Sequence, residues 1–160
     1  MTKYDWLLLF HLLSAFCFLS GAIVAGILHW LAMRRDKPSE IALLLGMVRP
    51  IVVLIGIGAV GTLVFGIWLT QDNPDGIALG DTWVIAAIVL WAISGALSGP
   101  AGKKMRHARE LAEKLAADGD QPSETLQRAV ADRQALVLNY LSFAAIIAML
   151  VLMVFKPGAG

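Results

Sequence analysis

Four long runs of apolar residues dominate the chain, and they predict four helices that cross a membrane. A helix needs about 20 mostly apolar residues to cross a hydrocarbon core of about 30 Å, because each residue rises about 1.5 Å. Runs of this kind occupy residues 6–33, 50–70, 82–99 and 135–155. Strands of a membrane barrel would need repeated short alternating segments instead. The pattern therefore predicts an all-α polytopic membrane protein, a four-transmembrane-helix bundle in a single domain over residues 1–160.

The polar stretches between the runs predict further helix. An apolar residue recurs at helical spacing among charged residues, at Met105, Ala108, Ala112 and Leu115. This pattern is typical of an amphipathic helix on a membrane surface and predicts a helical connection over about residues 101–134. Ser39 and Ser123 each follow a proline and precede a glutamate, so both are expected N-caps. No helix breaker separates Glu124 from the fourth run, which predicts one long helix there, and Pro50 is expected to begin or kink the second helix.

The distribution of basic residues predicts the orientation in the membrane. Lys and Arg favour connections on the cytoplasmic side. Four of them lie between the first and second runs and seven between the third and fourth, whereas the connection from Gln71 to Asp81 has none. We therefore expect the 101–134 connection to be cytoplasmic and both termini to be periplasmic or extracellular.

Composition agrees with membrane insertion and argues against two classes of partner. The 160 residues are 58% hydrophobic and 16% charged, against about 45–50% and about 25% in soluble domains. A formal net charge of +1 lacks the basic excess of nucleic-acid-binding proteins. A GxGxxG pattern at residues 56–61 lies inside an apolar run, where the backbone amides are already bonded, so no nucleotide is expected. Small residues at four-residue spacing are expected to be helix-packing faces, and the lipid bilayer is the expected partner. They are Gly58, Thr62 and Gly66 in the second run, and Ser94 with Ser98 and Gly95 with Gly99 in the third.

Two histidines in the first run supply the main candidate chemistry. His11 and His29 are eighteen residues, or five helical turns, apart, so their side chains share one face. One interpretation is structural, with both rings hydrogen-bonded across helices or to interfacial water. A second is that one or both ligate the iron of haem b, as in transmembrane cytochromes. Arg49 could then bind a propionate, although such an arginine also reaches lipid phosphate.

A third interpretation is a copper site. His11 would join Met149 and Met153, which are four residues apart on the fourth helix, as soft ligands for Cu(I). A methionine pair is also common core filler. No acidic residue lies within the four runs to orient a base or relay protons, so no catalytic residue is predicted and enzymatic activity is left open.

Several short motifs resemble those of a known family. They are Tyr4-Asp-Trp6-Leu-Leu with His11, Gly61-Thr-Leu-Val-Phe-Gly66-Ile-Trp68-Leu, Asp81-Thr-Trp83 with Leu90-Trp91, Gly95-Ala-Leu97, and Lys156-Pro157-Gly158. The whole chain resembles a bacterial family of small four-helix predicted integral membrane proteins, a domain of unknown function. This resemblance implies the topology and no activity.

A more distant resemblance concerns the first helix. His11, followed ten residues later by Gly21, is similar to the opening of the copper-resistance D proteins and of the small haem-binding membrane protoporphyrinogen oxidases. In the oxidases an early histidine ligates haem, and the resemblance implies that role for His11. The leading hypothesis comes from the two histidines on one face of the first helix: a bacterial inner-membrane protein that binds haem b at His11, assisted by His29, in a redox or tetrapyrrole-related accessory role. The alternatives are a structural or assembly subunit, as a homodimer or in a larger membrane complex, and a copper-handling protein.

Overall fold

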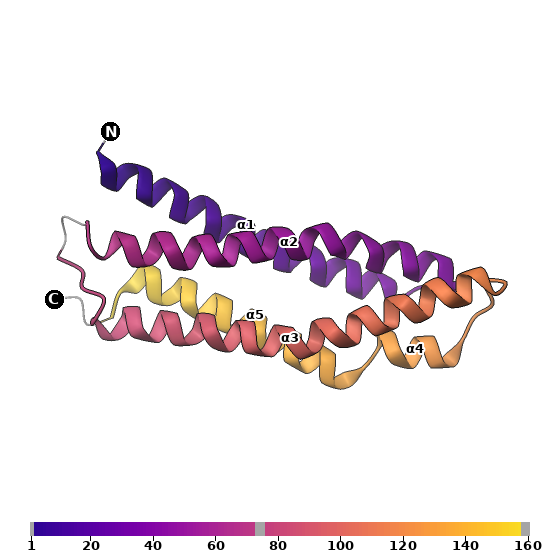
Figure 1. Ribbon diagram of the computed structural model, residues 1–160. Helices are drawn as coiled ribbons and strands as arrows, with labels where there is room; N and C mark the ends of the chain where they lie inside the picture. Colours follow the sequence, from indigo (N-terminus) through magenta and orange to yellow (C-terminus); the bar gives the residue numbers. More distant parts are fainter. Residues whose placement is uncertain (1, 73–75, 158–160) are drawn as a thin grey trace.

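The computed structural model shows an elongated helical bundle and describes residues 2–72 and 76–157 (Figure 1). These residues form five helices and no strand: α1 (Lys3–Ala32), α2 (Pro38–Leu69), α3 (Thr82–Ala117), α4 (Glu124–Val130) and α5 (Arg133–Phe155). Four stretches are long and apolar enough to span a membrane, namely α1, α2, α3 and the α4–α5 stretch. The all-α, four-span prediction is confirmed for the described residues.

The bundle has two chemically different ends. Both termini and the α2–α3 connection lie at one end, which we call the termini end (Figure 1). The α1–α2 turn, the last turns of α3 and the short α4 lie at the other. We call it the basic end, because the turn there carries Arg34 and Arg35 and the end of α3 carries further Lys and Arg residues.

The helices form two hairpins, α1 with α2 and α3 with α5. In the first hairpin the backbones approach closely at Gly58, where an added Cβ would lie 2.5 Å from the Phe18 nitrogen and 2.8 Å from the Ser14 carbonyl oxygen. Gly61 likewise lies against the Ser14 side chain. Close approach at small residues is how helices associate in lipid, so the predicted packing role of Gly58 is confirmed.

Three serine hydroxyls hold the second hairpin together. Ser142 Oγ on α5 lies 2.9 Å from Ser94 Oγ and 2.8 Å from Ser98 Oγ, both on α3. We call these residues the serine cluster. Hydrogen bonds between helices can stabilise packing in lipid, where apolar surface alone does not drive association. Ser94 and Ser98 thus pack as predicted, with Ser142 as their partner.

Two apolar clusters join the hairpins at different levels. The central core contains Phe18, Ala87, Ile146 and Met149. The basic-end core contains Ala32, Ile41, Leu45, Ala108, Ala112, Leu126 and Val130. Beside the central core, the Trp91 indole donates a hydrogen bond of 3.0 Å to the Ala59 carbonyl and ties α3 to α2. The hairpins are therefore fastened together at the middle of the bundle and at its basic end.

Two prolines lie inside continuous helices. Helix α2 runs through Pro50, so the prediction that this residue begins the second helix is wrong. Helix α3 runs through Pro100 to Ala117, so the expected separate helix on the membrane surface is also wrong. Bundles in lipid tolerate helical proline because neighbouring groups satisfy the freed carbonyl. The predicted amphipathic stripe is real, but its Ala108 and Ala112 pack into the basic-end core.

One of the two expected serine caps is confirmed. Ser123 accepts a hydrogen bond from the Leu126 amide at the start of α4. Ser39 is not an N-cap, because α2 begins one residue earlier with Pro38, whose fixed φ suits the first helical position. Ser39 instead donates from its hydroxyl and its amide to the Asp120 carboxylate, both at 2.7 Å. These bonds lower the pKa of Asp120.

The predicted continuous helix from Glu124 is wrong, because α4 ends at Val130 and α5 begins at Arg133. The Asp132 carboxylate accepts a hydrogen bond of 2.8 Å from the Ala135 amide. This side chain caps a new helix and thereby supplies the break between α4 and α5.

Candidate functional site

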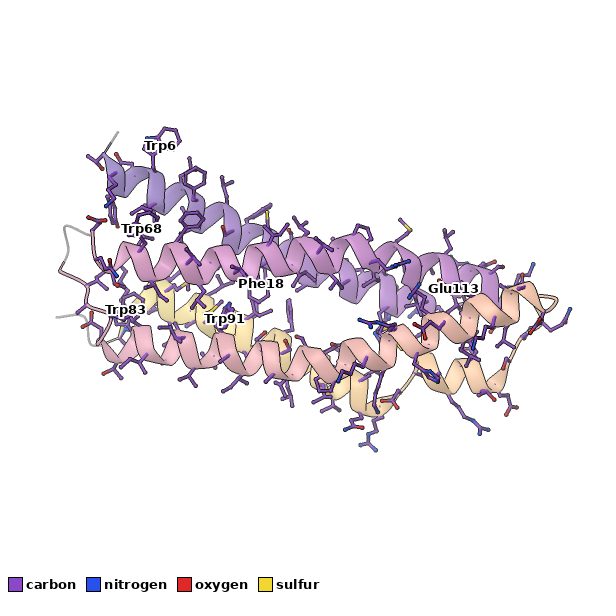
Figure 2. The ribbon with its side chains drawn as sticks, viewed as in Figure 1. Trp6, Phe18, Trp68, Trp83, Trp91 and Glu113 are labelled. Atoms are coloured by element: carbon purple, nitrogen blue, oxygen red, sulfur yellow. The ribbon has the colours of Figure 1, made fainter. Side chains whose placement is uncertain are left out.

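A cavity of about 1230 Å³ lies between the two hairpins, and all four spanning helices contribute to its walls. Phe18, Ile55 and Ile146 line its apolar side, next to the central core. Figure 2 labels Phe18, which lines the cavity on the side of the central core. Small-molecule pockets occupy about 300–1,000 Å³. This cavity is therefore large enough for a whole membrane-soluble molecule.

Glycines on facing helices leave this volume open. Gly26 of α1 and Gly99 and Gly102 of α3 line the cavity, and a Cβ added at any of them would meet no atom within 4 Å. This contrasts with Gly58, where the partner helix fills the space. The cavity therefore exists because these wall positions carry no side chain and no neighbouring side chain fills the space in front of them.

The basic side of the cavity carries a surplus of cations. Arg49 of α2 and Lys103, Arg106 and Arg109 of α3 line it, with Glu110 as the one carboxylate among the lining residues. Arg109 already forms an ion pair within the protein. Its guanidinium lies 2.7 Å from the Glu113 carboxylate, and its side chain is 13% exposed.

The other three cations differ from Arg109. Within the part of the chain that the structure describes, no ion pair engages Arg49, Lys103 or Arg106. Arginine binds carboxylate and phosphate through paired hydrogen bonds. The cavity is therefore apolar on one side and offers uncompensated cations on the other.

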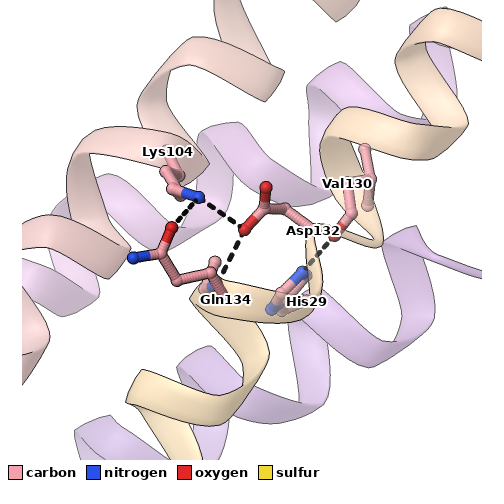
Figure 3. A network of polar contacts seen from close by, with 6 residues as sticks. His29, Lys104, Val130, Asp132 and Gln134 are labelled. Atoms are coloured by element: carbon pink, nitrogen blue, oxygen red, sulfur yellow. Dashed lines mark hydrogen bonds and ion pairs between the residues drawn. The ribbon is translucent and has the colours of Figure 1, made fainter.

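His29 lies in a polar junction on the same side of the cavity (Figure 3). Its Nε2 lies 2.8 Å from the Val130 carbonyl oxygen at the end of α4. Close by, the Lys104 ammonium lies 2.8 Å from the Asp132 carboxylate and 2.7 Å from the Gln134 side-chain oxygen. These contacts fasten α1 and α3 to the α4–α5 junction.

The hydrogen bond also fixes which ring nitrogen of His29 remains for a ligand. A carbonyl oxygen only accepts hydrogen bonds, so Nε2 must carry the proton and donate. When the ring is neutral, Nδ1 then carries the lone pair. His29 and Arg49, two of the three residues predicted to bind a cofactor, both line the cavity.

His11 lies elsewhere, between the helices of the first hairpin. Its Nδ1 lies 3.0 Å from the Thr62 carbonyl oxygen, and a Cβ added at Gly66 would approach its ring to 3.1 Å. The side chain is 9% exposed and is not among the residues that line the cavity. Both histidines therefore make the interhelical hydrogen bonds that one of the three interpretations predicts, and the haem role implied for His11 stays a prediction.

The methionines of the predicted copper site pack in and against the central core. Met149 is 3% exposed and clusters with Phe18, while Met153 packs against the same core. Phe18 is seven residues along α1 from His11, or about 10 Å by the helical rise. Among the described residues, no three of His, Cys, Asp or Glu form a group suited to a metal ion. A copper site at His11, Met149 and Met153 stays a prediction.

The sequence profile of one protein family covers nearly the whole chain. The profile of DUF2269, described as a predicted integral membrane protein, matches residues 5–157. The chain belongs to this family. It is therefore an integral membrane protein, in agreement with its four candidate spans. Among curated proteins and among solved structures, no match was found.

Sequence reasoning about this DUF2269 protein missed the cavity itself. The sequence named His29 and Arg49 as candidates for cofactor binding, but it did not predict an open space between the hairpins. Gly99 and Gly102, which shortly precede the basic residues of α3, were the available signal. The prediction that Gly95 and Gly99 form a packing face is wrong, because a Cβ added at either would meet no atom within 4 Å. Glycines can mark either a packed face or an open wall, and the choice depends on the partner helix, which the sequence alone does not place.

Proposed function

We propose that this membrane protein binds an amphipathic anionic molecule between its two hairpins. The ligand would place its apolar body toward Phe18 and its acidic group at the basic end. One observation supports this above the others: the cavity is apolar on one side and carries Arg49, Lys103 and Arg106 without carboxylate partners on the other.

The location of these cations explains the preference for an anion. Charged side chains near a membrane interior are costly and are usually paired. Their attraction for an acidic group also strengthens where protein and lipid exclude water. With the basic end in the cytoplasm, as the positive-inside rule favours, the acidic group would lie at the level of the inner-leaflet headgroups.

Two kinds of molecule share the required chemistry. A phospholipid has acyl chains and a phosphate, and haem b has a flat apolar ring with two propionates. Haem in this cavity would use Arg49 for a propionate and His29 Nδ1 for the iron, because Nε2 is engaged by Val130. A redox or tetrapyrrole-related accessory role follows if haem is the ligand. The shared element is an apolar body with one acidic end.

The proposal is tested by ligand-induced stabilisation of the detergent-purified chain. The probes are haem b, followed also by its Soret band, and dioleoyl phosphatidylglycerol, with dioleoyl phosphatidylcholine as the zwitterionic comparison. A ligand at about 100 times its Kd stabilises the folded state by about 2.7 kcal/mol, which is readily measured as a shift in Tm. We expect haem or phosphatidylglycerol to raise the Tm more than phosphatidylcholine does.

Matched variants locate the binding. Gly99→Leu on α3 and Gly26→Leu on α1 each add a side chain to the cavity wall without meeting any atom within 4 Å of the new Cβ. Gly95→Leu makes the same change one turn away, also in open space, at a residue that does not line the cavity. We expect the first two variants to lose the Tm shift and Gly95→Leu to keep it. Equal shifts in all three, or no shift with either anionic probe, would overturn the proposal.

A further inference from the structure

Asn139 of α5 is a polar side chain in the wall of the cavity, inside a stretch of helix that spans the membrane. It lies six residues after the start of α5 at Arg133. Leu136 and Phe143, about one turn to each side, line the same wall and are apolar. Polar groups in a spanning helix are costly and usually face the bundle interior or a polar pathway. Asn139 therefore brings a hydrogen-bonding group into an apolar part of the wall.

The amide of Asn139 has no partner within the protein. In the part of the chain that the structure describes, no hydrogen bond engages this side chain. Two other polar side chains of α5 are engaged, since Ser142 belongs to the serine cluster and Gln134 accepts a hydrogen bond from Lys104. An asparagine that joins helices would bond across their interface. The NH2 and carbonyl groups of Asn139 are instead left for a molecule in the cavity.

The contact between α2 and α3 shows which residues share a level in the bundle. These helices run antiparallel, and the Trp91 indole of α3 bonds the Ala59 carbonyl of α2. Ten residues further toward the basic end, α3 reaches Ala101 and α2 reaches Arg49. Equal numbers of residues cover equal lengths of helix, so Ala101 and Arg49 lie at about the same level.

The contact between α3 and α5 extends this level to Asn139. Ser98 Oγ of α3 and Ser142 Oγ of α5 lie 2.8 Å apart. Three residues further toward the basic end, α3 reaches Ala101 and α5 reaches Asn139. Asn139 therefore lies at about the level of Arg49. Both residues line the cavity, and they belong to different hairpins.

We propose that Asn139 binds the acidic group of the ligand together with Arg49. This inference rests on the proposed function and assigns a residue that determines its specificity. The Arg49 guanidinium supplies charge and paired hydrogen bonds, and the Asn139 NH2 donates a further bond from the other hairpin. A neutral amide adds this bond without another charge that must lose its water. The phosphate of a phospholipid and a propionate of haem both accept such a bond, so the assignment holds for either ligand.

The unpaired amide predicts that stability and binding respond in opposite directions to one substitution. Replacing an unpaired polar group by an apolar group of similar size is neutral or stabilising, because no partner is left unbonded. Asn139→Leu should therefore keep or raise the Tm of the ligand-free chain while it weakens binding. An amide that joined helices would show the reverse, because its loss would lower the ligand-free Tm.

The test measures ligand-free Tm values, and Kd values for haem b and dioleoyl phosphatidylglycerol, on the detergent-purified full chain. For an anionic probe that wild type binds, Asn139→Leu should raise the Kd about ten-fold or more, the size of a hydrogen bond to a charged group. Asn139→Asp should raise it further, because the new carboxylate repels the acidic group and competes for Arg49.

Gln134→Glu is the matched control for the added charge. It makes the same change from amide to acid on the same helix, at a residue that does not line the cavity. The oxygen that accepts the Lys104 hydrogen bond is kept. We expect this variant to bind the anionic probe as wild type does.

The outcomes separate this inference from the proposed function. If Gly99→Leu abolishes binding but Asn139→Leu binds as tightly as wild type, the assignment of Asn139 is wrong while the cavity proposal stands. A lower ligand-free Tm of Asn139→Leu would contradict the unpaired amide and overturn the assignment. If Gln134→Glu weakens binding as much as Asn139→Asp, added charge acts at any position and the assignment also fails. If neither haem nor phosphatidylglycerol binds wild type, both proposals fail.

Discussion

Substituting Gly58 by alanine should disrupt the packing of α1 against α2. The new Cβ would lie 2.5 Å from the Phe18 nitrogen, 2.8 Å from the Ser14 carbonyl oxygen and 3.0 Å from the Phe18 Cα. Ordinary contact begins at 3.4 Å, so the α1 backbone would have to retreat by about 1 Å. All three atoms belong to a helix backbone, which cannot turn aside as a side chain does.

The expected magnitude follows from two opposing effects. Overpacking of a well-packed interface costs about 1–3 kcal/mol. Replacing a helical glycine with alanine returns up to about 1 kcal/mol through backbone entropy. With the full entropic gain, the unfolding free energy should fall by about 0–2 kcal/mol relative to wild type, and by about 1–3 kcal/mol relative to an unhindered Gly→Ala variant that has the same gain. Gly56→Ala is the matched control, because its Cβ meets no atom within 4 Å, and it should be neutral or slightly stabilising.

The assay is equilibrium unfolding in mixed micelles with increasing sodium dodecyl sulfate, followed by circular dichroism. Gly58→Ala should unfold at a lower dodecyl sulfate fraction than Gly56→Ala. If Gly58→Ala is as stable as Gly56→Ala, then α1 and α2 do not approach as closely as described, and the hairpin packing derived from these contacts is refuted.

Three further predictions concern the basic end. His29→Ala should destabilise the chain by about 1–3 kcal/mol in the same unfolding assay, because it leaves a buried carbonyl unpaired; unchanged stability would show that this bond is not formed. The lowered pKa of Asp120 means that its bonds to Ser39 stabilise the fold fully above its ordinary pKa of 3.8 and are lost as pH falls through the lowered value. Proteolysis of the α3–α4 loop should therefore rise on acidification in wild type, and Asp120→Asn should remove that dependence. Arg106→Gln should weaken binding of phosphatidylglycerol, whereas Arg128→Gln should not, since its ion pair is exposed to solvent and away from the cavity; equal Kd values for the two variants would contradict the role of the cavity cations.

The fold was largely predictable because the bilayer requires long apolar helices. Their number and approximate positions follow from hydropathy alone. The boundaries of the helices were harder to predict. Pro50 lies inside a continuous helix although it reads as a boundary, and Asp132 starts a new helix although no glycine or proline marks it. Both boundaries depend on contacts with other helices. Groups on neighbouring helices can satisfy the carbonyl that Pro50 frees. His29 and Lys104 form hydrogen bonds with the α4–α5 junction.

The candidate site was predictable in part. One of the three interpretations of the His11 and His29 face, hydrogen bonding across helices, agrees with the structure, because both rings bond carbonyls of other helices. Helical periodicity gives the direction of a side chain but not the distance to its neighbour. It therefore could not show that His29 borders a cavity while His11 is enclosed within a hairpin.

Native mass spectrometry of the chain released from mild detergent tests most directly whether an anionic amphipathic molecule occupies the cavity. We expect wild type and Gly95→Leu to carry one anionic amphipathic molecule per chain, identified by its mass, and Gly99→Leu to be released without it. A wild-type chain that is released bare, or a Gly99→Leu chain that retains the same molecule, would contradict the claim.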